Sequence, residues 1–262
     1  NRELMIHPMS VVHPQAKIGQ NVEIGPYTTI EADVVIGDNT WIGPNVTIMN
    51  GARIGSHCKV FPGAVISAIP QDLKFVGEQT TAEVGDHTTI RECVTINRGT
   101  SDRMTTKVGS HCLLMAYVHI AHDAFVGNHC IIANSGNIAG HVDIEDWVII
   151  EGVVAVQQFV RIGKHAFIAG GSLVRKSVPP YIKVAREPLS FIGVNAIGLR
   201  RRNFSEESVQ AIEDIYRKLY VHAPTVGKGV EMVGELPEGE YKDEILAFIQ
   251  ASDKGIVKGV NG

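Results

Sequence analysis

An aliphatic residue recurs at every sixth position along most of the chain. From Ile6 to Val174 this register contains 29 positions, and all but three of them carry isoleucine, valine or leucine. Glycine often follows the aliphatic residue directly, and a small or β-branched residue commonly stands four positions after it. The pattern predicts that each group of six residues, a hexad, forms a short strand and a turn with two side chains pointing inward.

A single hexad cannot bury its aliphatic side chain, so the hexads must stack on one another as a solenoid. Three hexads per coil give a triangular turn of 18 residues, and adjacent coils then lie about 4.8 Å apart, the spacing of neighbouring strands. This hexapeptide pattern resembles the left-handed parallel β-helix. The handedness is implied by that resemblance and not by the spacing.

The three exceptions to the register mark two interruptions of the solenoid. They are Asp72, Glu78 and Asp102. We therefore expect loops to leave the solenoid near residues 67–83 and 97–107. Loops on a rigid scaffold are common places for binding residues.

The hexads end after Val174, and Pro179-Pro180 marks the change. We expect the β-helix to occupy residues 5–178 and a small helical domain to occupy residues 179–262. Ser205 has the character of an N-cap, because two glutamates and then apolar residues at helical spacing follow it. A second helix is expected from about Glu240 to Ala251, with a frayed tail after it.

Composition and charge exclude some classes of function. The formal net charge of -4 gives no general reason to expect nucleic-acid binding. No apolar run approaches the roughly 20 residues that span a bilayer, so no stable membrane insertion is expected. The four cysteines show no paired spacing, which is typical of reduced thiols in a cytoplasmic protein. We expect Met5 to be the natural start of the chain.

The eleven histidines divide by their position in the hexad. Six of them occupy the same slot, three residues after the aliphatic position, where a polar turn residue is the simplest interpretation: His57, His87, His111, His129, His141 and His165. His119 and His122 stand in other slots. The 18-residue coil predicts that His122 stacks against Gly140 and that Asp123 stacks against His141.

This group of residues suits acyl transfer to a hydroxyl group. A neutral imidazole, whose ordinary pKa is about 6.5, can take the proton of an alcohol as the new bond forms. Asp123 can hold the tautomer of the ring and stabilise the imidazolium. The N–H of Gly140, with no side chain in the way, can donate to the developing oxyanion.

Five local motifs now carry a resemblance to a known family. They are "PQDLKFVGE" at 70–78, "VTINRGT" at 94–100, "VHIAHD" at 118–123, "AGHV" at 139–142 and "GVNAIGLRRRNF" at 193–204. In this order, and within the hexapeptide array, they resemble the UDP-N-acetylglucosamine O-acyltransferase family of lipid A biosynthesis. The resemblance covers nearly the whole chain and is weakest after about residue 222.

The resemblance implies a homotrimer with active sites between neighbouring solenoids. The donor would be a (R)-3-hydroxyacyl chain on the phosphopantetheine of acyl carrier protein, the acceptor would be the 3-hydroxyl of UDP-N-acetylglucosamine, and no further cofactor or metal would be needed. His122 would be the general base, Asp123 its orienting partner and Gly140 the oxyanion donor. Substrate contacts would come from Asp72, Lys74, His119, His141, Gln158, Asn195, Arg201 and Arg202, with Gly170 at the end of the acyl tail.

Three positions depart from the family pattern. Asn97 stands where the family usually has histidine, Gln157 where a histidine commonly precedes "QF", and Ile197 where an acidic residue often follows the nucleotide asparagine. These differences leave His122, Asp123 and Gly140 intact. The hypothesis is that the reaction is preserved and that acceptor contacts are rearranged.

Three alternative functions stay open at this point. The acceptor could be an amine, either in a UDP-3-amino sugar or in the next acyltransferase of the pathway, although that enzyme carries an extra N-terminal domain before its hexads. Some hexapeptide proteins are zinc carbonic anhydrases, and His119, His122 and His141 could be such ligands. A non-enzymatic scaffold is the third.

For the acyl carrier protein, an acidic partner, the expected basic surface comprises Arg161, Lys164, Arg175 and Lys176.

Overall fold

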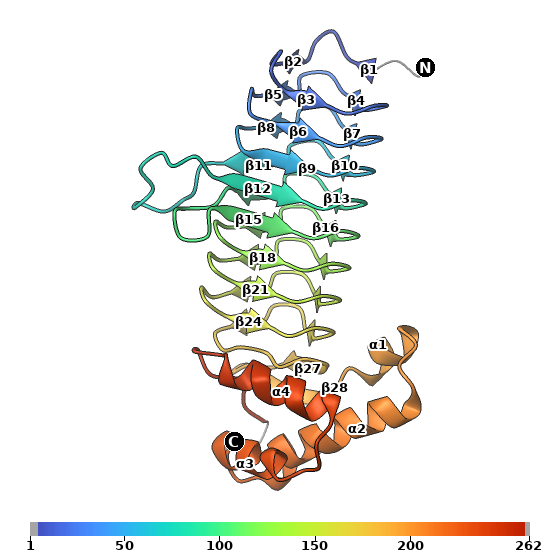
Figure 1. The fold of residues 1–262 in the computed structure, drawn as a ribbon, viewed down its shortest axis with the longest axis vertical. Coiled ribbons are helices and arrows are strands. Elements are labelled where there is room, and N and C mark those ends of the chain that lie inside the picture. Colours follow the sequence, from blue (N-terminus) through green and yellow to red (C-terminus); the bar gives the residue numbers. More distant parts are fainter. Residues whose placement is uncertain (1–4, 260–262) are drawn as a thin grey trace.

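The computed structural model describes residues 5–259, which form a long prism of short strands with helices packed at one end (Figure 1). The chain visits three sheets in turn, so each coil contributes one strand to each sheet. Ile120 pairs with Ile138, and Ile138 pairs with Val156, at the predicted spacing of 18 residues. Residues 1–4, which were expected to precede the natural start, lie outside the described residues.

The three sheets, here called A, B and C, contain 11, 9 and 8 strands, and most of the strands are only two residues long. Sheet A contains β1 (Met5–Ile6), β4 (Glu23–Ile24), β7 (Trp41–Ile42), β10 (Lys59–Val60), β13 (Thr89–Ile90), β16 (Leu113–Leu114), β19 (Ile131–Ile132), β22 (Ile149–Ile150), β25 (Phe167–Ile168), β27 (Ile182–Ala185) and β28 (Ser190–Val194). Sheet B contains β2 (Val11–Val12), β5 (Thr29–Ile30), β8 (Thr47–Ile48), β11 (Val65–Ala68), β14 (Thr95–Asn97), β17 (His119–Ile120), β20 (Asn137–Ile138), β23 (Ala155–Val156) and β26 (Leu173–Val174). Sheet C contains β3 (Lys17–Ile18), β6 (Val35–Ile36), β9 (Ala52–Ile54), β12 (Thr81–Val84), β15 (Thr105–Val108), β18 (Phe125–Val126), β21 (Asp143–Ile144) and β24 (Arg161–Ile162).

The hexad aliphatics form the core of the prism. Ile42, Ile120 and Ile150 each have 0% of their surface exposed, and most of the register is at most 3% exposed. Burying apolar surface contributes about 25 cal/mol for each Å² removed from water, so the stacking of coils supplies the main driving force. The predicted class, a mainly β solenoid followed by helices, is confirmed.

The corners between the sheets explain why one slot of the hexad favours polar residues. Most corners hold a residue in the left-handed backbone region, such as Asp123 (φ 61°), His129 (φ 57°) and His141 (φ 58°). Asparagine, aspartate and histidine are the non-glycine residues found most often in that conformation. We name the corners by the sheets that they join: the A–B edge, the B–C edge and the C–A edge.

Both interruptions of the register are loops that leave the B–C edge. The first occupies residues 69–80 between β11 and β12, and the second residues 98–104 between β14 and β15, and both project from the left side of Figure 1. Ile66 pairs with Ile96, 30 positions on, and Ile96 with Ile120, 24 positions on. Since each insertion is a whole number of hexads, the aliphatic register continues through both loops.

The C-terminal part caps the solenoid. After β28, which pairs antiparallel to β27, come α1 (Ala196–Arg201), α2 (Glu206–Arg217), the π-helix η1 (Lys218–His222), α3 (Val226–Gly234) and α4 (Glu240–Gln250). Ser205 caps α2 by accepting a hydrogen bond from Ser208 N, as predicted, and α4 also follows the prediction. The helices α1 and α3 were not predicted. Among the described residues no helix is both long enough and apolar enough to cross a bilayer.

The expectation of a frayed tail was wrong for the described part of it. Ile256 forms a β-bridge with Ser177, and Lys258 forms one with Ser190. The Val257 side chain is 2% exposed. Two apolar residues between glycines give too little periodicity to signal a strand, so this pairing depends on contacts that are distant in the sequence.

Candidate active site

The B–C edge holds a buried histidine and aspartate side by side. His122 and Asp123 lie in the corner between β17 and β18, with 5% and 0% of their surfaces exposed. His122 Nδ1 lies 2.9 Å from Asp123 Oδ2. When Nδ1 donates to the carboxylate, the lone pair of a neutral ring is at Nε2, so this arrangement sets Nε2 as the basic atom.

Asp123 is held by the second extruded loop, which the sequence did not link to it. Its Oδ1 accepts hydrogen bonds from Thr100 N at 3.0 Å and Arg103 N at 3.2 Å, and its Oδ2 accepts one from Thr100 Oγ1 at 2.6 Å. Burial alone raises the pKa of Asp123, but the hydrogen bonds from Thr100, His122 and Arg103 outweigh burial and lower it. Asp123 is therefore a carboxylate at neutral pH.

Gly140 stacks against His122, as the 18-residue coil predicts. A Cβ atom added at Gly140 would lie 2.6 Å from His122 Cε1 and 2.8 Å from Nε2, so no side chain fits there. The Gly140 N–H has no hydrogen-bond partner within residues 5–259. In a matching corner of the A–B edge, Gly170 N donates to Glu151 Oε2 at 2.9 Å. The Gly140 N–H, which is unpaired in the described part of the chain, therefore lies beside the His122 ring.

Two further histidines line this place. Thr95 Oγ1 lies 2.6 Å from His119 Nδ1, and burial followed by the charge of His122 lowers the pKa of His119. The ring of His141 meets that of His122 at 83°, with the centroids 5.2 Å apart. His141 Nδ1 is 2.9 Å from Asp102 Oδ2, an ion-pair distance without the alignment of a hydrogen bond.

The same residues have the composition of a metal site, although not the one that the sequence suggested. His122, Asp123 and His141 each offer a ligand atom, and these atoms lie within 4.8 Å of one another, whereas His119 is not in this group. The carboxylate oxygens of Asp123 already accept four hydrogen bonds. A carboxylate has about four acceptor positions, so a metal would have to displace partners that are in place. The donor set therefore favours acid–base chemistry.

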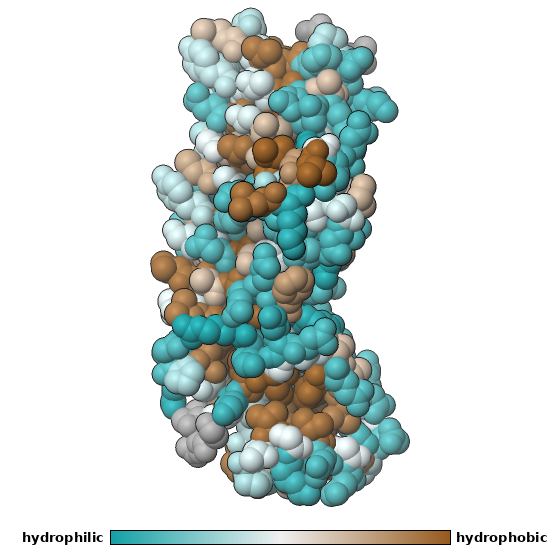
Figure 2. Space-filling view, turned by 90° about the vertical axis from the view of Figure 1, so that its left-hand side faces the viewer, coloured by the Kyte–Doolittle hydropathy of each residue, from teal (hydrophilic) through white to brown (hydrophobic). Residues whose placement is uncertain are grey.

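Three more predicted residues lie on the B–C edge. Asp72 and Lys74 are in the first loop, where Lys74 N donates to Asp72 Oδ1 at 2.9 Å. Gln158 is exposed in the corner two coils beyond His122. Hydrophilic side chains cover most of this side of the molecule, with hydrophobic patches at mid-height and toward the C-terminal helices (Figure 2).

The remaining predicted residues lie on other edges. Gly170 is on the A–B edge. Asn195 is 6% exposed and donates from Nδ2 to the carbonyl of His165 on the C–A edge at 3.0 Å. Arg202 lies 3.1 Å from His165 Nδ1 and 5.2 Å from the centre of the Trp147 ring, and burial lowers the pKa of Arg202. Arg201 is exposed. One chain alone does not bring these residues to His122.

The positions that depart from the family pattern differ in their surroundings. Asn97 is 3% exposed, and its Oδ1 has no hydrogen-bond partner within the described part of the chain. Gln157 and Ile197 are both exposed, the latter at 62%. Asn97 is thus the departure with a buried polar atom that a bound group can satisfy.

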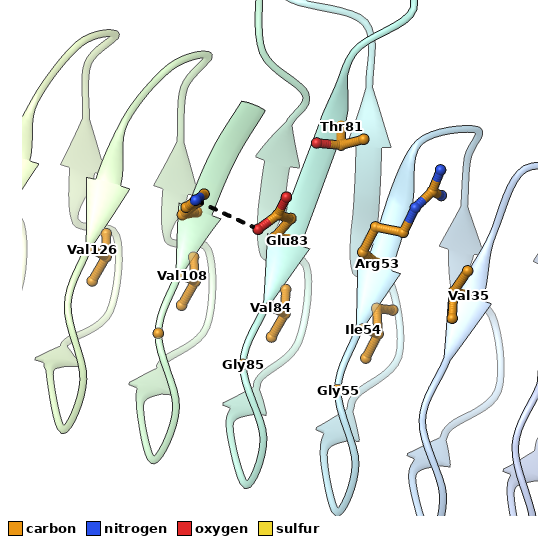
Figure 3. Close-up of a pocket in the computed structure, with 12 residues that line it drawn as sticks. Val35, Arg53, Ile54, Gly55, Thr81, Glu83, Val84, Gly85, Val108 and Val126 are labelled. Atoms are coloured by element: carbon orange, nitrogen blue, oxygen red, sulfur yellow. Dashed lines mark ion pairs between the residues drawn. The ribbon is translucent and has the colours of Figure 1, made fainter. Parts of the chain in front are cut away.

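A separate groove, of about 600 Å³, contains none of the predicted residues. It lies on the outer face of sheet C, where Arg53, Glu83 and Val35 come from neighbouring strands (Figure 3). Lys107 Nζ and Glu83 Oε2 are 3.8 Å apart across it. No group in this groove is placed for acid–base chemistry, so its size does not make it the active site.

Two family models match parts of this chain. The model of domain 2 of UDP-N-acetylglucosamine O-acyltransferase matches residues 178–257, and the model of the bacterial transferase hexapeptide matches residues 33–68. Hexapeptide repeats of this kind fit the left-handed β-helix that the resemblance implied.

Relatives named as UDP-N-acetylglucosamine acyltransferases match along almost their whole length. The acyl-[acyl-carrier-protein]–UDP-N-acetylglucosamine O-acyltransferase of Janthinobacterium sp. (strain Marseille) is 45% identical over 260 residues, which are 97% of this chain and 99% of that one. The crystal structure of a UDP-N-acetylglucosamine acyltransferase from Bacteroides fragilis has 48% sequence identity and a TM-score of 0.94, covering 97% of this chain and all of that one. The enzyme of Francisella novicida gives 38% identity, a TM-score of 0.94, and coverage of 98% and 95%. This likeness over nearly the full length shows that the chain is an acyltransferase and belongs to the UDP-N-acetylglucosamine O-acyltransferase family.

Proposed function

We propose that the protein transfers a (R)-3-hydroxyacyl chain from acyl carrier protein to the 3-hydroxyl of UDP-N-acetylglucosamine, the first step of lipid A biosynthesis. The observation that carries this proposal is the buried pair of His122 and Asp123 beside the unpaired N–H of Gly140. Base and oxyanion donor are the two groups that acyl transfer to an alcohol requires. The names of the relatives supply the donor and the acceptor.

His122 is the general base in this mechanism. Nε2 takes the proton of the sugar hydroxyl while the sugar oxygen attacks the thioester carbonyl carbon. The imidazolium that results lies 2.9 Å from the Asp123 carboxylate, which stabilises its charge. Because Thr100 and Arg103 N–H fix that carboxylate, the ring is held before the substrate arrives.

Gly140 stabilises the tetrahedral intermediate. As the carbonyl oxygen becomes an oxyanion, it accepts a hydrogen bond from the Gly140 N–H. The C–S bond then breaks, the sugar ester forms, and the thiolate of the carrier arm takes the proton from His122. Every atom of the step comes from the two substrates and the imidazole, so the proposal needs no metal or further cofactor.

The edges occupied by the other residues support a trimer. Asp72, Lys74, His119, His141 and Gln158 share the B–C edge and are proposed to line the substrates. Asn195 and Arg202 lie near His165 on the C–A edge. If these residues and Arg201 bind the nucleotide, they reach a sugar at His122 from a neighbouring copy, which is the arrangement of a homotrimer with sites between subunits. We place the reaction in the cytoplasm, where a carrier protein presents the acyl chain.

A transfer assay with two acceptors tests this function. The purified protein is offered 3-hydroxyacyl carrier proteins of several chain lengths with UDP-N-acetylglucosamine or its 3-amino analogue. We expect transfer to the hydroxyl sugar, and a fall in kcat of about 10²- to 10⁴-fold in His122→Ala, the range that a general base contributes. Preference for the amine would instead make the protein an N-acyltransferase, with Asn97 the first residue to exchange.

A histidine on the C–A edge provides the matched control. His111→Asn removes an imidazole from the same protein but keeps a residue that tolerates the left-handed backbone. We expect its kcat to stay within about twofold of the wild type. A His122→Ala enzyme as active as His111→Asn would overturn the mechanism, and zinc retained in stoichiometric amount would favour the carbonic anhydrase alternative.

A further inference from the structure

A cavity of about 590 Å³ lies at the C-terminal end of the solenoid, away from His122. It is bounded by the end of β26, the turn between β27 and β28, and the tail, which forms bridges to Ser177 and to Ser190 of β28. The side chains that matter for its chemistry are Leu173, Arg175, Lys176, Arg186, Leu189 and Lys258. Its floor is apolar and its rim is basic.

The rim concentrates positive charge on a chain whose formal net charge is -4. Arg175 Nη1 binds Glu187 Oε1 at 2.7 Å. Lys176, Arg186 and Lys258 are all exposed, and none of them forms an ion pair with a carboxylate within residues 5–259. A surface with three uncompensated cations attracts an acidic partner and steers its approach.

One residue of the cavity rim, Lys176, lies on the edge that carries the base. In the 18-residue register, Lys176 follows Gln158, Gly140 and His122 along the B–C edge, one residue per coil. With coils about 4.8 Å apart, Lys176 stands about 14 Å along this edge from His122. A carrier protein holds its thioester at the end of a long flexible arm, so its body must dock at a distance from the base, along a path open to the arm.

Two of the cations expected from the sequence to bind the carrier protein serve another purpose. Lys164 Nζ binds Glu244 Oε2 of α4 at 2.8 Å, and the Arg161 guanidinium lies 4.8 Å from the centre of the Phe248 ring in the same helix. Both side chains therefore fasten α4 to the solenoid. Arg161 and Lys164 are already engaged by α4, so the basic rim of this cavity consists of Arg175, Lys176, Arg186 and Lys258 instead.

We propose that this basic cavity is the docking surface for the acidic acyl carrier protein, which seats against its rim and extends its acylated arm along the B–C edge to His122. The partner rests on the proposed function, while the surface rests on the charge and position of these residues. Leu173, 41% exposed, and Leu189 give the partner an apolar contact inside the ring of cations.

Direct binding of 3-hydroxyacyl carrier protein tests the surface. The test variant carries Lys176→Glu, Arg186→Glu and Lys258→Glu, and the control variant carries three reversals on exposed lysines elsewhere, Lys17→Glu, Lys59→Glu and Lys228→Glu. Both variants have the same change in net charge. We expect the Kd for the carrier protein to rise at least about tenfold in the test variant and to change less than threefold in the control.

Transfer assays on the same preparations separate this proposal from the proposed function. With an acyl-pantetheine donor, which lacks the carrier protein, the test variant should keep the wild-type kcat/KM, and this also shows that it folds. An unchanged Kd, an equal rise in the control, or a rise in the KM for UDP-N-acetylglucosamine in place of the Kd for the carrier protein would each overturn the docking surface. Binding that is lost in the test variant while the wild type transfers no acyl chain would uphold the surface and refute the function.

Discussion

Two edges of the same prism use histidine in different ways. On the C–A edge His57, His87, His111 and His129 stack face to face, with centroids 4.7 to 4.8 Å apart and ring planes within 3° of parallel. On the B–C edge His122 and His141 meet almost at right angles. The first arrangement follows when coils repeat the same residue in the same slot. The second requires that neighbouring coils differ.

The comparison shows that the slot within the hexad does not decide what a histidine does. His141 occupies the same slot as His129, yet it contacts His122 and Asp102, while His129 stacks between His111 and Trp147. The slot fixes the backbone conformation, and the edge fixes the neighbours. Chemistry therefore depends on the position in the 18-residue coil and not on the position in the hexad.

Among changes that keep His122 itself, the largest effect should come from filling the space beside its ring. In Gly140→Ala the added Cβ would overlap the imidazole, so the ring or the backbone donor must move, and we expect kcat to fall by about 10²- to 10³-fold, as for the loss of an oxyanion donor. Gly152→Ala is the matched change in the same slot of the A–B edge, where the Cβ would lie 3.4 Å from Asn134 O. Steady-state kinetics on both variants would contradict this reading of the B–C edge if their kcat values fell alike.

A smaller effect is expected from loosening the carboxylate partner. Thr100→Val removes the Oγ1 hydrogen bond to Asp123, and a bond to a charged group contributes about 1.5 to 3 kcal/mol, so kcat should fall by about 10- to 100-fold. Thr88→Val removes a part-buried hydrogen bond to Gly109 O from a C–A corner and should lower the melting temperature while kcat stays near the wild-type value, which steady-state kinetics on both variants would check.

The third prediction concerns His165 on the C–A edge and the stability of the folded protein in acid. Burial, together with the charges of Arg202 and Lys164, lowers the pKa of His165 to about 4. The unfolded chain binds a proton at this position below about pH 6.5 and the folded chain does not, so stability is lost as the pH falls from 6.5 toward 4. By pH 5 the loss amounts to about 2 kcal/mol, and His165→Phe should remove it. Urea titrations at pH 5 and pH 7 measure the difference, and an equal pH dependence in both proteins would contradict the assignment.

Most of the solenoid could be predicted because its period is written in the aliphatic register. Stacking of Gly140 on His122 follows from that period. The C-terminal cap was only partly predictable. Ser205 predicts the start of α2, whereas α3 and the pairing of Ile256 depend on tertiary contacts. Short apolar groups such as these carry no period of their own.

The sequence predicts the residues at the centre of the candidate site but not the residues that hold Asp123 in place. His122, Asp123 and Gly140 stand out because they depart from the repeat, but nothing in the residues alone links Thr100 or Arg103 to Asp123 across 20 or more positions. The only signal was that their loop interrupts the register. The work of Lys164 and Arg161 in holding α4 was likewise invisible, since it requires knowing where that helix packs.

The linear stacking of coils also determines where the protein can open. Each coil is bonded only to the two beside it, so fraying starts at an end and spreads inward one coil at a time. At the N-terminal end Met5 and Val11 are 60% and 67% exposed, whereas helices cover the other end. Amide hydrogen exchange should therefore be fastest in the first coils and slow around β17 and β20. His122 and Gly140 lie in coils that fraying from the N-terminal end reaches last. The reaction geometry therefore stays intact while the first coils open and close.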